Sequence, residues 1–219
     1  FFEEVQGVPV LLSLLVLIFT RTADDAADLF QTLPRSRIAL YKASTNAALQ
    51  RAANAAGKSA HDIEEMLRAI AVRAHLARVR EFKGDDIRAA LTPELFALWE
   101  DLFRSDGAAG VPLIKSLEVG LGAGAVDGEA PTASGEVGSG CFQFKHLSLQ
   151  EYLFVTAVTE SSPAVQNWDP IGEMTTNFYL NTFRIGGEAL GVTVAGRLAS
   201  APTLTLNGES CAAMLHCLP

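Results

Sequence analysis

The clearest chemistry in this sequence is a histidine at the expected start of a helix. His146 follows Cys141–Phe144, which is typical of a short strand, and residues 149–156 continue with the apolar spacing of a helix. The first turn of a helix has backbone N–H groups without a helical partner, which favours an anion there. An imidazole N–H also donates to phosphate, and more strongly when protonated. This placement would suit an anion contact at His146, although the default for a histidine beside aromatic residues is a structural role with a hydrogen bond to backbone.

Other residues with catalytic potential lack the spacing that catalysis requires. Glu64–Glu65 and Asp85–Asp86 are adjacent pairs on expected helices, where neighbouring side chains face different directions and do not converge. His61 and His75 have no acidic or cysteine partner at catalytic spacing. We therefore expect solvated or structural roles for these residues and no catalysis by this chain alone.

The cysteines indicate neither a disulfide framework nor a metal site. Cys141, Cys211 and Cys217 form no even set, which favours a reducing, cytoplasmic compartment. Cys211 and Cys217 with His216 supply too few ligands, wrongly spaced, for zinc. We expect no metal site here.

Composition excludes several classes of protein. The 219 residues are 49% hydrophobic and 19% charged, which is typical of a folded domain with a core. A formal net charge of -8 argues against broad contact with nucleic-acid backbone or an anionic membrane. The apolar run Val8–Phe19 is shorter than the ~20 residues of a bilayer-spanning helix, and Glu3 and Glu4 precede it, unlike in a signal peptide. We expect a buried helix there, in a chain whose lack of an initial Met suggests a fragment.

The remaining pattern predicts a mainly α fold with a winged-helix part. Residues 120–140 are a glycine-rich loop that is no phosphate cradle, because Asp127 breaks the G-x-G-x-x-G pattern and no Gly-Lys-Ser/Thr follows. A small hairpin with this long tip, after helices, is what a winged helix would produce. The expected elements are helices over residues 35–51, 59–76, 85–91, 93–103 and 147–158, and strands within 111–121 and 141–144.

The end of the chain has a different pattern. Leu190, Val194 and Leu198 have helical spacing, and Leu204 and Leu206 then alternate towards Asn207. A helix, a turn and a short strand of this kind are similar to one leucine-rich-repeat unit.

Two segments together resemble the NACHT family, the nucleotide-switch module of NOD-like receptors and other STAND ATPases. The segment Gly7–Leu15 resembles the proline-led apolar helix that follows the family's nucleotide-binding subdomain. Residues Phe142–Leu153 match the family's Phe-x-His-x-Ser-Phe-Gln-Glu-Tyr-Leu stretch in the winged helix, with Leu149 where Phe is more usual. The resemblance covers roughly residues 1–160.

The resemblance implies a nucleotide-dependent signalling switch. In the family, ATP or ADP and its magnesium are held by an upstream P-loop subdomain, over which the helical and winged-helix parts close. Pro9 would pack against adenine, and His146 would donate a hydrogen bond to the β-phosphate of ADP and lock the closed state. The implied partners are the upstream subdomain, other copies of the protein on activation, and a ligand sensed by the repeats, without nucleic acid or a membrane span.

The expected organisation is a helical subdomain over residues 1–80, a winged helix over 81–160, a linker over 161–180 and a leucine-rich-repeat-like region over 181–219.

Two other functions compete with the switch. A helical protein-interaction scaffold without nucleotide control shares all these features, and only the upstream motifs would separate the two. A winged-helix nucleic-acid binder needs a basic recognition helix, whereas Leu147–Val158 carries no Arg or Lys and contains Glu151.

Overall fold

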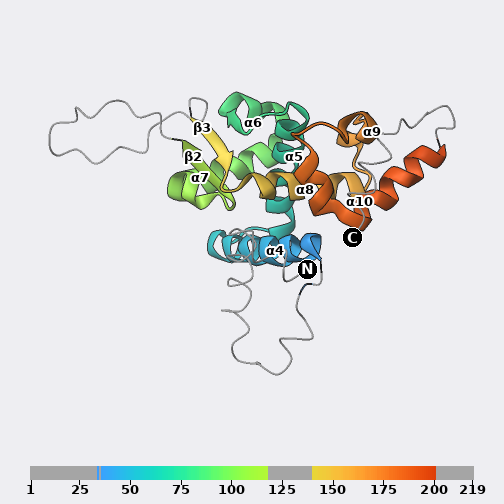
Figure 1. Ribbon diagram of the computed structural model, residues 1–219. Helices are drawn as coiled ribbons and strands as arrows, with labels where there is room; N and C mark the ends of the chain where they lie inside the picture. Colours follow the sequence, from blue (N-terminus) through green and yellow to red (C-terminus); the bar gives the residue numbers. More distant parts are fainter. Residues whose placement is uncertain (1–33, 35, 118–139, 201–219) are drawn as a thin grey trace, which may run out of the picture. The chain divides into compact units, whose positions relative to one another are not determined.

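The computed structural model describes residue 34, residues 36–117 and residues 140–200 (Figure 1). In this part of the chain the fold is mainly α, with one small antiparallel sheet. The chain divides into two compact units. We call Ala48–Leu147 the wing unit, and the described residues before Ala48 and after Leu147 the helical unit.

The wing unit has the order of elements of a winged helix. Helix α5 (Ala60–Leu76) leads to strand β1 (Glu81–Lys83), helices α6 (Gly84–Ala90) and α7 (Pro93–Gly110), and strands β2 (Ile114–Leu117) and β3 (Cys141–Phe144). Strand β3 lies between the other two, antiparallel to both, with Phe142 opposite Phe82 and Ser116. Strand β1 was not anticipated, because three residues are too short to show an alternating pattern.

Local signals set the boundaries of these helices. The Ser59 side chain accepts a hydrogen bond from the Asp62 N–H and caps α5, as the sequence predicted. Thr92 caps α7 in the same way, with Pro93 in the first turn. Helix α6 begins where the Asp86 carboxylate accepts from the Lys83 N–H, at 2.9 Å. The predicted pair of helices is thus confirmed, although α7 runs further than expected, to Gly110.

An aromatic cluster joins α7 to the sheet. Trp99, which is fully buried, meets Phe142 edge-on with ring centroids 5.4 Å apart, and Phe103 meets Phe142 at 5.7 Å. Phe82 and Phe144 pack at 5.8 Å within the sheet. Burial of each such ring stabilises the fold by about 1.5–3 kcal/mol, so the cluster holds α7 against the sheet.

The helical unit is organised around α8 (Leu147–Thr159). This helix is apolar on nearly all sides and is largely buried, as expected for a central helix. Tyr41 on α4 (Arg37–Ala56) stacks on Tyr152, with centroids 5.8 Å apart. Phe154 meets Trp168 edge-on at 5.0 Å, and Trp168 in turn stacks on Phe183 of α10 (Leu180–Ser200).

The segment expected as a linker, residues 161–180, is packed rather than extended. It contains a short 3-10 helix (Pro163–Val165) and α9 (Pro170–Glu173), and the side chains of Val165, Trp168 and Tyr179 are buried. Arg197 on α10 donates to the Trp168 carbonyl at 2.9 Å, which fixes the segment from the other side. The Pro, Gly and Asp residues of this segment gave it the composition of a loop. Its aromatic residues nevertheless pack into the core.

Helix α10 contains a kink at Gly187, whose φ of 47° and ψ of -133° are not helical. The helix predicted over Leu190–Leu198 is present and starts earlier than expected, while the predicted strand at Leu204–Leu206 lies outside the described residues. None of the helices described combines the length and apolar character that crossing a membrane requires.

Candidate functional site

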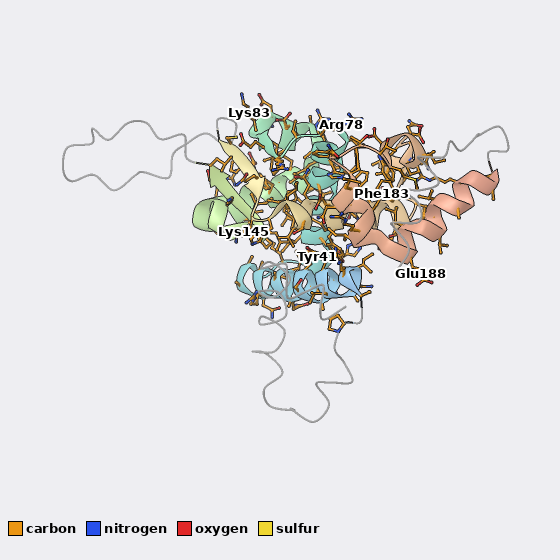
Figure 2. The ribbon with its side chains drawn as sticks, viewed as in Figure 1. Tyr41, Arg78, Lys83, Lys145, Phe183 and Glu188 are labelled. Atoms are coloured by element: carbon orange, nitrogen blue, oxygen red, sulfur yellow. The ribbon has the colours of Figure 1, made fainter. Side chains whose placement is uncertain are left out.

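His146 lies on the surface between the end of β3 and the start of α8. The backbone of the preceding residue is held in place, because the Lys145 N–H donates to the Leu113 carbonyl at 2.8 Å. Lys145, which is labelled in Figure 2, is also exposed. Two side chains with nitrogen donors thus stand immediately before a helix of 13 residues. The predicted position of His146 at a helix start is confirmed, and the arrangement suits an anion.

The polar residues that follow His146 in the motif have internal partners instead. A side-chain hydrogen bond joins Ser148 to Tyr41 of α4. Asn181 donates through its amide to the Glu151 carboxylate, which is 2% exposed. Gln150 is 1% exposed. Of the motif's polar triplet, therefore, His146 faces solvent whereas Ser148 and Gln150 belong to the interior packing.

The surroundings of Tyr41 favour its protonated form. Burial raises the pKa of Tyr41 above its usual value, and the nearby Glu151 charge adds to the rise. The hydrogen bond with Ser148 and the Arg37 charge act in the opposite direction but do not cancel these effects. A tyrosine that keeps its proton so firmly serves as a hydrogen-bonding group and not as a base.

The two remaining histidines of interest differ in environment. His75 is fully buried on α5, and burial lowers its pKa to about 3, so the ring is neutral at pH 7. His61 is exposed and lies beside the Asp62 carboxylate, with Nδ1 and Oδ1 3.5 Å apart. Both histidines lie on α5, His75 on its buried face and His61 at its exposed start.

The other site predictions fall in two classes. Pro9, expected to contact adenine, lies outside the described residues, as do Cys211, His216 and Cys217. Among the residues that are described, no cluster of His, Cys, Asp and Glu has the arrangement of a metal site.

The helix that could contact nucleic acid differs from the one considered from the sequence. In a helix-turn-helix the second helix enters the groove, and here that helix is α7, not the stretch Leu147–Val158 considered from the sequence. The exposed residues of α7 include Glu94, Asp101 and Arg104, so this surface is acidic as well. The expectation of no nucleic-acid partner thus rests on α7.

A groove that the sequence did not reveal lies between the start of α5 and the exposed side of α7, with a volume of about 590 Å³. Lys58, just before α5, donates to Asp101 of α7 at 2.6 Å and joins the two helices. The two residues are 43 positions apart in the sequence, so helical spacing alone gave no sign that they meet.

Comparison with protein-family models, with curated proteins and with solved structures found no match for this chain. The resemblance to the NACHT family therefore stays a prediction.

Proposed function

We propose that this chain is the helical and winged-helix part of a NACHT-type signalling switch, which closes over ADP or ATP bound to an upstream P-loop subdomain. The observation that carries the proposal is the exposure of His146 directly before α8, within a motif whose neighbouring polar residues are turned inward. Because His146 is exposed while its neighbours in the motif are turned inward, its side chain can contact a ligand that is bound to another part of the protein.

The residues present suit a phosphate. His146 supplies an N–H donor, Lys145 supplies a full positive charge, and the first turn of α8 supplies backbone N–H groups. The chain is acidic overall, so this small basic region gives a local contact and not a general affinity for anions.

The switch would operate by a shift of populations. ADP would bind the closed, inactive arrangement better because its β-phosphate accepts from His146, and exchange for ATP would remove that preference. Magnesium would be held by the upstream part. Self-association on activation, sensing by a leucine-rich region from about Asn181 onwards, and a cytoplasmic location belong to the same proposal.

The first test is the coding sequence upstream of Phe1. We expect it to encode G-x-x-x-x-G-K-Ser/Thr after a strand, followed by a strand that ends in acidic residues. An upstream region without a phosphate loop would overturn the switch and leave the helical protein-interaction scaffold as the better proposal.

The second test measures ADP retention by the full-length protein. Loss of a hydrogen bond to a charged group costs about 1.5–3 kcal/mol, so His146→Ala should speed ADP release about 10-fold or more and increase spontaneous oligomers. His61→Ala is the matched control, because His61 is an exposed histidine on another helix. Equal ADP release from both variants and the wild type would contradict the role of His146.

A further inference from the structure

The groove between α5 and α7 combines an acidic rim with apolar residues. Five carboxylates line it, against two cations: Asp62, Glu65, Glu94, Glu100 and Asp101 with Lys58 and Arg104. Between them the apolar side chains of Leu95, Ala97 and Leu98 are partly or fully exposed. The groove therefore has an excess of three negative charges around an apolar strip.

The two cations of the groove are already engaged. Lys58 pairs with Asp101 at 2.6 Å, and Arg104 pairs with Glu100 at 3.2 Å and with Asp101 at 3.7 Å. Asp62, Glu65 and Glu94 lie on the exposed sides of α5 and α7. These three carboxylates are thus placed to attract a cationic ligand.

Two carboxylates of the groove, Asp101 and Glu94, have a pKa below the usual value. The hydrogen bond and the charge of Lys58 lower the pKa of Asp101. Hydrogen bonds from its own backbone and from Thr92 lower the pKa of Glu94. Both of these carboxylates therefore stay negatively charged at neutral pH.

The segments 1–33, 118–139 and 201–219 of this sequence have no basic character. Residues 118–139 and 201–219 contain no Lys or Arg, and residues 1–33 contain Arg21 against five carboxylates. Nucleic acid is repelled by the same charges. The charge of the groove is therefore complementary to a basic segment, which brings apolar side chains for the strip and cations for the rim.

We propose that this groove binds an extended peptide segment of a partner protein, in which Lys or Arg alternates with apolar residues. Leu95 and Leu98 contact the apolar side chains, and Asp62, Glu65 and Glu94 pair with the cations. In this proposal the wing unit binds a protein on the exposed side of α7, the second helix of its helix-turn-helix. This inference is independent of the proposed nucleotide switch, because none of these residues belongs to the motif around His146.

The test is fluorescence anisotropy at physiological salt with a labelled peptide of alternating arginine and leucine. A matched peptide of alternating glutamate and leucine serves as the negative probe. Exposed ion pairs contribute about 0.2–1 kcal/mol each, so E65Q/E94Q should weaken binding of the basic peptide about 5-fold. Ala97→Lys, which places a cation within the strip at an exposed position, should weaken it further.

The control double variant is E81Q/D85N, which removes the same charge from exposed positions outside the groove. We expect it to bind the basic peptide like the wild type. An equal loss in E65Q/E94Q and E81Q/D85N would show attraction to net charge alone and overturn the groove. Failure of the wild type to distinguish the two peptides, or preferential binding of a labelled DNA duplex, would overturn it as well.

Discussion

At the scale of single residues, the contact between Glu151 and Asn181 tests whether the motif's polar residues stabilise the interior. Glu151 is 2% exposed, and Asn181 donates to its carboxylate. Asn181→Ala leaves that carboxylate short of a donor, so the free energy of unfolding should fall by about 1.5–3 kcal/mol. Urea unfolding followed by circular dichroism measures the loss.

Asn177→Ala is the control for this variant, because Asn177 is an exposed asparagine close to the start of the same helix. Its effect should stay within about 0.5 kcal/mol. Equal losses from the two variants would show that the Glu151 contact adds nothing to stability.

At the residue scale, one part of the site could be predicted from the sequence and another part could not. The exposed His146 at a helix start followed from the change of pattern after Phe144. That Ser148 turns to Tyr41 did not follow, because the two residues are brought together by the packing of α4 and α8 and no local spacing relates them. The acidic groove was hidden for the same reason.

At the scale of elements, the kink in α10 requires glycine at one position. Gly187 has a φ of 47° and a ψ of -133°, a region that side chains with a Cβ rarely adopt. Gly187→Ala should therefore lower the free energy of unfolding by about 1–3 kcal/mol, or straighten the helix at a similar cost.

Gly191→Ala in the same helix is the matched control for this prediction. A Cβ there would meet no atom within 4 Å, so the higher helix propensity of alanine should raise stability by up to about 1 kcal/mol. Thermal unfolding of both variants separates the two cases, and shifts of the same sign would contradict a kink that depends on Gly187.

Elements with capping signals and strong periodicity were predictable, and short or interrupted ones were not. Ser59, Thr92 and Pro93 marked helix starts through chemistry that acts within one turn. Strand β1 forms because β3 supplies its hydrogen bonds, and the segment around Trp168 is ordered by Phe154 and Phe183. In both cases the cause is a distant partner that the local sequence does not show.

At the scale of the whole molecule, His75 links stability to pH. Burial lowers its pKa to about 3 in the folded chain, whereas an unfolded histidine has a pKa of 6.5. Above pH 6.5 the ring is neutral in both states and its protonation has no effect on folding. As the pH falls from 6.5 towards 3, the unfolded chain binds a proton that the folded chain does not, so stability is lost progressively.

This linkage amounts to about 2 kcal/mol between pH 7 and pH 5, an order-of-magnitude value. His75→Gln removes the titrating group, so its urea midpoint should change less over that interval than the wild-type midpoint, whatever its stability at pH 7. His61→Gln, at an exposed position, should keep the wild-type dependence. Carboxylates contribute equally to the pH dependence of all three proteins. A parallel decline of the urea midpoints of the wild type and His75→Gln would therefore mean that His75 is protonated without unfolding, against the burial seen in α5.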